Sequence, residues 1–182
     1  MGATRTAANS RGRLLSELEI ERVWLLSRMP KLPIDAEHWE VEQGYLPESP
    51  ALPTDAADFL EGRLRRIRMP DGRVFYKHTV KRGEGMIREE YERSISDAEF
   101  ERAWPSTVGR RINKSRYRVR DGTLTWEIDQ FRSLPLVMVE VELPDPHTAV
   151  VLPMWLASLV EREVTFDPRY RNAALAIDGV PA

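Results

Sequence analysis

The sequence is dominated by short runs in which apolar and polar residues alternate, and turn signals separate these runs at short intervals. Asp121-Gly122 divides the run at 112–120 from the run at 123–130, and an Asp-Gly connection between alternating runs is a strong hairpin signal. Pro70-Asp71-Gly72 and Ser133-Leu134-Pro135 separate further runs in the same way. Six or more such runs predict antiparallel strands, and many short strands joined by tight turns indicate a β-sandwich or a β-barrel.

Few segments favour helix, so the predicted class is α+β and mainly β. Ser96-Asp97-Ala98-Glu99 is a capping box and predicts the start of a helix that ends near Trp104-Pro105. Asp167 followed by Pro168 is typical of an N-cap and a first helical position, which predicts a last helix through about Ile177. Two weaker signals are a short turn near 37–39, capped by Asp35, and a helix within 153–161.

Length and composition exclude several classes of protein. The chain has 182 residues, and we expect a mobile tail over 1–13 followed by one domain over 14–180. It has no cysteine, which excludes disulfides and thiolate chemistry and suits a cytoplasmic protein. No apolar run approaches the roughly 18 residues of a membrane span. The net charge of −2 lacks the basic excess of a nucleic-acid-binding protein.

The polar faces of the predicted strands carry charges in pairs of like sign. Side chains at positions i and i+2 share one face of a strand, so Glu19 and Glu21 point to the same side. A divalent cation relieves the repulsion between adjacent carboxylates, and paired Arg or Lys side chains suit phosphate oxygens. The other pairs are Arg63 with Arg65, Glu90 with Glu92, Lys114 with Arg116, Glu127 with Asp129 and Glu140 with Glu142, while Lys81 stands alone at the end of its strand.

These pairs allow two interpretations. An antiparallel sheet with one solvated face alternates in the same way, and that explains any single pair well. Six like-charge pairs together favour a barrel whose lumen carries both signs of charge and could hold a metal–polyphosphate complex. The three histidines have no spacing typical of a zinc site, and no G-x-x-x-x-G-K-[ST] run is present. We expect the five tryptophans to pack in the core or against helices: Trp24, Trp39, Trp104, Trp126 and Trp155.

The order of the charged motifs resembles the triphosphate tunnel metalloenzyme family, also called the CYTH superfamily, and in particular its small bacterial tripolyphosphatases. Glu19-Ile20-Glu21-Arg22 resembles the N-terminal ExExK signature of that family, and Gln43-Gly44-Tyr45-Leu46 resembles its QGYL segment. The resemblance extends from about Leu18 to Ile177. It continues through Glu61–Arg65 (ExRxR), Lys81 with Arg88–Glu92 (K…R-x-E-Y-E), Trp104-Pro105, Gly109–Arg111, Lys114–Tyr117, Glu127–Asp129, Val139–Glu142, Val164-Thr165 and Arg169–Asn172.

The resemblance implies a fold, a ligand and a set of site residues. The fold is an eight-stranded antiparallel barrel that forms a tunnel, with helices outside and a C-terminal helix near one mouth. The ligand is a small-molecule triphosphate, bound with Mg²⁺ or Mn²⁺ and hydrolysed. Arg169 or Arg171 would reach the end of the tunnel. The implied metal ligands are Glu19, Glu21, Asp129, Glu140 and Glu142, the phosphate-binding residues are Arg63, Arg65, Lys81, Lys114 and Arg116, and the acids that orient the attacking water are drawn from Glu90, Glu92 and Asp129.

One position departs from the family pattern. The lysine of the ExExK signature falls at Val23, and the neighbouring Arg22 points to the other face of the strand. Three functions therefore stay open: hydrolysis of tripolyphosphate or a small organic triphosphate, binding without catalysis, and an adenylate cyclase, for which no adenine pocket is evident. A closed barrel has no free edge, which favours a monomer, while apolar residues in 150–159 could support a homodimer.

Overall fold

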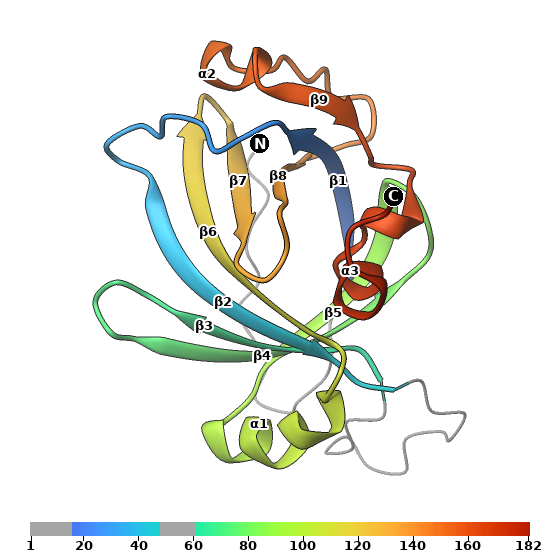
Figure 1. Cartoon of the computed structure of the whole chain (residues 1–182). Coiled ribbons are helices and arrows are strands. Elements are labelled where there is room, and N and C mark those ends of the chain that lie inside the picture. Colours follow the sequence, from blue (N-terminus) through green and yellow to red (C-terminus); the bar gives the residue numbers. More distant parts are fainter. Residues whose placement is uncertain (1–15, 48–60) are drawn as a thin grey trace.

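The computed structural model describes residues 16–47 and 61–182, so the predicted tail at 1–13 lies outside the described residues. Eight antiparallel strands close into a barrel in the order β5-β4-β3-β2-β6-β7-β8-β1, because β1 also pairs with β5 (Figure 1). The prediction of an eight-stranded barrel is confirmed. The strands are β1 (Ser16–Leu26), β2 (Glu37–Tyr45), β3 (Arg63–Arg68), β4 (Val74–Arg82), β5 (Ile87–Ser94), β6 (Arg111–Asp121), β7 (Leu124–Phe131), β8 (Val137–Glu142) and the additional β9 (Val160–Glu163).

The predicted turns lie where the sequence placed them, with one exception. Gly72 and Gly122 take φ values of +86° and +60° in the β3–β4 and β6–β7 connections, a conformation that glycine adopts at little cost. Residues 132–136 connect β7 to β8. The predicted turn near 37–39 is wrong, because β2 begins at Glu37 and is hydrogen-bonded to β3 on one side and β6 on the other. Pairing with both neighbouring strands holds the start of β2 in the extended conformation.

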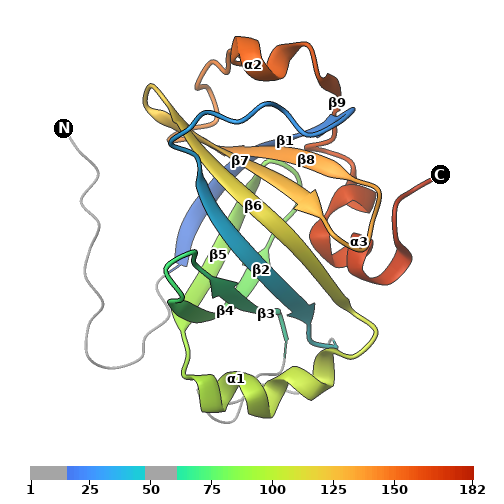
Figure 2. The same cartoon turned by 60° about the vertical axis from the view of Figure 1, so that its left-hand side comes forward.

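The capping-box helix is confirmed. Ser96 caps α1 (Asp97–Ala103) and exchanges hydrogen bonds with Glu99, and the short 3₁₀ helix η1 (Trp104–Thr107) follows directly. Below the barrel in Figure 2, α1 covers the outer face of the sheet, where Phe100 packs with Leu64. None of the helices in the described parts of the chain is long and apolar enough to cross a membrane.

The C-terminal helices differ from the prediction. Asp167 caps only the 3₁₀ turn η2 (Pro168–Tyr170), and α3 (Asn172–Asp178) begins separately because Arg171 is extended, with φ −66° and ψ 139°. The expected helix within 153–161 shortens to α2 (Met154–Ala157). The chain then forms β9, which hydrogen-bonds to β1 beyond the point where β5 ends. The expectation of a C-terminal helix near one mouth is confirmed (Figure 1).

The hydrophobic core lies mainly outside the barrel. One buried cluster covers the outer face of β1, β6, β7 and β8, where Trp126, Val139 and Val141 pack beneath α2. A second cluster fills one end of the barrel, where residues of the inner face pack against α3 and the segment before it. It consists of Val23, Leu25, Ile112, Phe131, Met138, Val164, Tyr170 and Leu175. Because apolar side chains are buried on the outside and at this end, the middle of the lumen is left to charged residues.

We predict that Ser96→Ala lowers the free energy of unfolding by about 1 kcal/mol, because the variant loses the side-chain oxygen that accepts from the Glu99 backbone N–H. Chemical denaturation measures this loss. The exposed Ser94, which caps no helix, supplies the control variant Ser94→Ala. Equal stability of the two variants would contradict the importance of the cap.

Candidate active site in the barrel lumen

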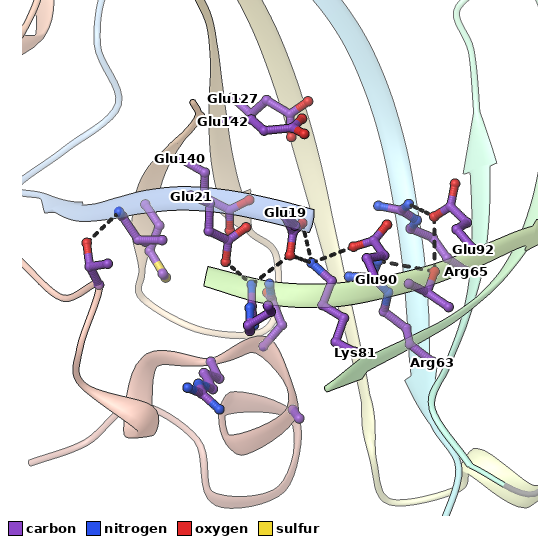
Figure 3. A pocket seen from close by; sticks show the side chains of 18 of the residues that line it. Glu19, Glu21, Arg63, Arg65, Lys81, Glu90, Glu92, Glu127, Glu140 and Glu142 are labelled. Carbon is purple, nitrogen blue, oxygen red and sulfur yellow. Dashed lines mark hydrogen bonds and ion pairs between the residues drawn. The ribbon is translucent and has the colours of Figure 1, made fainter. Parts of the chain in front are cut away.

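The barrel encloses a cavity of about 1530 Å³, lined by side chains from all eight barrel strands. Strand alternation turns the predicted like-charge pairs inward, and Figure 3 shows carboxylates and cations interleaved on the cavity wall. Ten of the predicted site residues line the cavity. They are Glu19, Glu21, Arg63, Arg65, Lys81, Glu90, Glu92, Arg116, Glu140 and Glu142. Lys114 and Asp129 do not line it, because they are buried in the wall behind it with 1% and 0% exposure.

Two cations hold the carboxylates of β1. The Lys81 Nζ atom lies 2.5 Å from Glu19 Oε1 and 2.9 Å from Glu90 Oε2, as the dashed lines in Figure 3 show. The Arg88 Nη2 atom lies 3.0 Å from Glu19 Oε2 and donates a second hydrogen bond to Glu21. Lys81 of β4 and Arg88 of β5 therefore neutralise Glu19 and Glu21. Both cations belong to the K…R-x-E-Y-E motif described above.

A second group of charges joins β3, β4 and β5. Arg65 Nη2 and Thr79 Oγ1 donate to Glu92 Oε2 over 2.8 Å and 3.0 Å, and Lys77 Nζ lies 3.2 Å from the other oxygen. Burial opposes ionisation of Glu92, but the charges of Arg65, Lys77 and Arg63 outweigh it and lower its pKa. Burial and the neighbouring Arg63 lower the pKa of Arg65 to about 10, so its guanidinium remains charged at neutral pH.

The third group is a buried ion network on β6, β7 and β8. Arg116 donates to both oxygens of Asp129 over 2.7 Å each, and to Glu140 over 2.8 Å. Lys114 Nζ lies 2.5 Å from the same carboxylate. Burial alone would raise the pKa of Asp129, yet the charges of Arg116 and Lys114 lower it to about 2. Asp129 therefore stays ionised and fixes the direction of Arg116 toward the cavity.

Three arginines leave donors without acceptors. The Nε atoms of Arg63, Arg65 and Arg88 are buried and make no hydrogen bond among the described residues. Arg63 also forms no ion pair within residues 16–47 and 61–182, although it lines the cavity beside Glu90 and Glu92. Buried guanidinium N–H groups normally have acceptors, so these donors favour an anionic ligand in the lumen.

Among the acids of the cavity, Glu142 lacks an ion-pair partner within the described residues. Desolvation, followed by the nearby carboxylates of Glu19, Glu127 and Glu90, raises its pKa. This unrelieved negative charge fits a divalent cation, and an all-carboxylate donor set suits Mg²⁺ or Mn²⁺. Among the described residues, however, no three acidic or histidine side chains are already gathered as a metal cluster.

Val23 lies where the wall of the lumen becomes apolar. It belongs to the inner cluster beneath α3, and it stands opposite Glu140 in the pairing of β1 with β8. Arg22 points outward, as predicted, and pairs with Glu163 on β9. Of the two arginines expected near the tunnel end, Arg171 lines the cavity, whereas the exposed Arg169 pairs with Asp167.

Several cavity residues were missed or misplaced by sequence reasoning. Alternation on β4 puts Lys77 and Thr79 on the same face as Lys81, a signal that could have identified them. Trp39, expected in the core or against a helix, lines the cavity instead. Its position in β2 was hidden by the wrong turn prediction at 37–39. Other cavity-lining residues that were given no role include Tyr45, Arg88, Arg110 and Arg118.

We predict opposite effects on stability from two neighbouring acids in metal-free protein at pH 7. Glu142→Gln raises the melting temperature, because it removes a charge that is disfavoured first by desolvation and then by neighbouring carboxylates. Glu140→Gln lowers it, because it breaks the ion pair with Arg116. Thermal unfolding in a chelator measures both changes.

The pH dependence follows from the raised pKa of Glu142. A carboxyl whose pKa is higher in the folded than in the unfolded state destabilises the fold as pH rises through these values. The gain from Glu142→Gln is therefore largest near neutral pH and disappears as pH falls below the unfolded pKa of about 4.3. A gain of equal size at both ends of this range would exclude the charge of Glu142 as its cause.

No protein-family model matches the sequence. The inorganic triphosphatase of Nitrosomonas europaea is 39% identical over 165 residues, which cover 87% of this chain and 97% of that protein. The inorganic triphosphatase of Acetivibrio thermocellus is 42% identical over 66 residues, covering 35% of this chain and 40% of the relative.

A solved structure agrees with this relationship. The crystal structure of the inorganic triphosphatase NE1496 superimposes with a TM-score of 0.56 at 33% identity, and the match covers 90% of this chain and 97% of that chain. Identity above 30% over nearly the full length of a relative, the closed eight-stranded barrel and the charged lumen agree with one another. The chain belongs to the triphosphate tunnel metalloenzyme family.

Proposed function

We propose that this protein hydrolyses a small-molecule triphosphate inside the barrel with the help of a divalent cation. The observation that carries the proposal is the set of buried Nε donors on Arg63, Arg65 and Arg88, which lack acceptors among the described residues and belong to a cavity rich in carboxylates. Two curated relatives are named inorganic triphosphatases, which supports hydrolysis over binding alone. Inorganic tripolyphosphate is accordingly the first substrate to test.

The phosphate-binding residues in this proposal are the inward cations. Arg63 has no carboxylate partner within the described ranges and is available to a phosphate oxygen. Arg65 and Lys81 would exchange part of their contact with Glu92 and Glu19 for phosphate contacts. Arg116 would contact phosphate directly, while Lys114 supplies positive charge from behind the wall. Arginine suits this task because its fork of donors matches two phosphate oxygens.

The metal-binding residues in this proposal are the acids that line the cavity, namely Glu19, Glu21, Glu140 and Glu142. Asp129, which we also expected among them, is enclosed by Lys114 and Arg116, and this supports a role in orienting Arg116. When bound, Mg²⁺ or Mn²⁺ would neutralise phosphate charge and lower the pKa of a coordinated water. The phosphate would in turn take Lys81 and Arg88, freeing the oxygens of Glu19 and Glu21 for the cation.

Three acids were candidates for orienting the attacking water. Asp129 lies behind the cavity wall, and Glu92 is held by Arg65, Thr79 and Lys77. Glu90 has Lys81 as its one cation partner among the described residues and lines the cavity. We therefore assign this role to Glu90. Phosphoryl transfer depends mainly on positioning and charge neutralisation, so no covalent nucleophile is required.

The setting of the reaction completes the proposal. The absence of cysteine is consistent with a reducing compartment, and we place the enzyme in the cytoplasm. The barrel has no free edge between β1 and β5 that would require a partner strand, so we expect a monomer or a homodimer. The small lumen-bound substrate makes nucleic acid and membrane partners unnecessary.

We predict that purified protein releases phosphate from tripolyphosphate only when Mg²⁺ or Mn²⁺ is present. Arg65→Ala should lower kcat/KM roughly 10- to 100-fold through the loss of a charge-assisted contact. The matched control is Arg68→Ala, since Arg68 is exposed on the same strand but not part of the cavity. It should change kcat/KM less than twofold. The assay includes ATP, GTP and thiamine triphosphate.

Two outcomes would contradict this function, and a third would contradict its location in the lumen. Tight binding of the triphosphates without phosphate release from any of them would establish a binding module. Formation of cyclic AMP from ATP in place of free phosphate would establish a cyclase. Equal losses in Arg65→Ala and Arg68→Ala would mean that the lumen is not the site.

We predict that Val23→Lys raises kcat/KM for tripolyphosphate and lowers the melting temperature. The new amine would stand opposite Glu140 and add positive charge to the cavity wall, but it would also enter the apolar cluster beneath α3. Val23→Met, which adds length without charge, is the control. Unchanged or reduced turnover in Val23→Lys would show that the valine does not limit the reaction.

A further inference from the structure

Arg88 holds the two carboxylates of β1 that face the lumen. Its Nη2 atom lies 3.0 Å from Glu19 Oε2 and donates a second hydrogen bond to Glu21. Figure 3 shows Glu19 and Glu21 next to each other on β1. One guanidinium therefore bridges two neighbouring carboxylates and relieves their repulsion, as a divalent cation bound by both would do.

Closure of the barrel puts Arg88 in this position. Arg88 stands directly opposite Glu19 in the pairing of β1 with β5. Glu21 lies two residues farther along β1, within the diagonal reach of a long side chain on the neighbouring strand. The backbone N–H of Glu21 donates to the carbonyl oxygen of Met86 over 3.1 Å, which holds the two strands together at this point. The contact of Arg88 with both acids is therefore a consequence of the closed barrel.

Arg88 differs from Arg65, a second cavity arginine, in its partners. Arg65 pairs with Glu92 and contacts neither of the two acids of β1. Within residues 16–47 and 61–182, the ion pairs of Arg88 are with Glu19 and Glu21 alone. A divalent cation that binds these two acids would therefore compete with Arg88 and not with Arg65.

The competition is strongest at Glu21. On the side away from β5, Glu21 stands directly opposite Glu142 of β8, and like charges in this position repel. A divalent cation would relieve that repulsion, but it would bring positive charge next to the guanidinium that already contacts Glu21. Arg88 and a cation therefore cannot both be bound favourably at this carboxylate.

Arg88 has a donor that a phosphate could use. Its Nε atom is buried and makes no hydrogen bond among the described residues, although buried guanidinium N–H groups normally have acceptors. Arg88 lines the same cavity as Arg63 and Lys81. A phosphate oxygen in this cavity would supply the missing acceptor and draw the positive charge of Arg88 away from the acids of β1.

We propose that Arg88 couples the binding of metal to the binding of triphosphate. Without a triphosphate, Arg88 holds Glu19 and Glu21 and keeps the affinity for a free divalent cation low. A triphosphate takes the guanidinium for its own oxygens and leaves both carboxylates to the cation. This inference deepens the proposed function and rests on it, because it uses the lumen as the triphosphate site and the acids of β1 as metal ligands. The protein thereby selects a metal–triphosphate complex over the free metal ion.

The main test measures Mn²⁺ binding to the full chain without triphosphate, from the electron paramagnetic resonance signal of unbound Mn²⁺. Arg88→Gln should bind Mn²⁺ roughly 10- to 100-fold more tightly than wild type, the factor expected when a charge-assisted contact no longer competes. Arg88→Lys, which keeps the positive charge, should stay close to wild type. The matched control is Arg65→Gln, which removes the same charge from the lumen without freeing an acid of β1. It should tighten Mn²⁺ binding less than about threefold, because its charge is more distant.

Two further measurements separate this role from a change in folding. Thermal unfolding in a chelator verifies that each variant is folded. Added Mn²⁺ should then raise the melting temperature of Arg88→Gln more than that of wild type, because a more tightly bound ligand stabilises the folded state more. Tripolyphosphate binding in a chelator should weaken roughly 10-fold in Arg88→Gln, because the phosphate loses a charge-assisted contact.

The outcomes distinguish the role of Arg88 from the proposed function. Mn²⁺ binding to Arg88→Gln that is no tighter than to Arg65→Gln would overturn the coupling, as would an unchanged tripolyphosphate affinity of Arg88→Gln. Wild-type protein that releases no phosphate from tripolyphosphate with Mn²⁺, while the variants show the expected affinities, would refute hydrolysis and leave the coupling supported. Phosphate release together with equal Mn²⁺ affinities of the two variants would refute the coupling alone.

Discussion

The buried carboxylate of Asp129 is the interaction on which the charged lumen depends. It is fully enclosed and receives hydrogen bonds from Arg116 and Lys114, so three charges share the wall between β6 and β7. A buried charge without a partner costs several kcal/mol, and Lys114 pairs with no other carboxylate among the described residues, so Lys114 depends on Asp129 to stay charged in this wall. Through Arg116 the network reaches Glu127 and Glu140, and so sets the geometry of the cavity surface.

A lumen of this kind requires the hydrophobic core to form elsewhere. The outer face of β1, β7 and β8 packs beneath α2, and α1 packs on the outer face of β3. These clusters bury the apolar surface that stabilises the barrel and leave the inner face free for chemistry. As a result, like charges lie close together in the lumen and repel one another. The alternation of cations and carboxylates on neighbouring strands reduces this repulsion in part. Glu142, left without a cation among the described residues, marks where that relief is incomplete.

Much of the site follows from the period of two along a strand. In each strand, alternation places both members of a pair on one face, so Glu19 with Glu21 and Arg63 with Arg65 can all face the lumen of a barrel. The charges of these pairs favour a divalent cation and a phosphate group as ligands. The same rule did not identify Trp39, because a local turn signal at Asp35 competed with the strand pattern. The C-terminal helix was likewise predicted as one unit, although the extended Arg171 divides it from the 3₁₀ turn before it.

The sequence by itself determined the antiparallel strands, the tight turns and the sign of charge on each strand face, since these depend on neighbours within a few residues. Tertiary structure alone decided which charges pair and which remain free. The contacts of Lys81 with Glu19, of Arg88 with Glu21 and of Arg116 with Glu140 join residues that are distant along the chain, and closure of the barrel brings them together. It also decided that Lys114 lies behind the wall and that Val23 belongs to an apolar cluster, because burial depends on what packs against a strand from outside it.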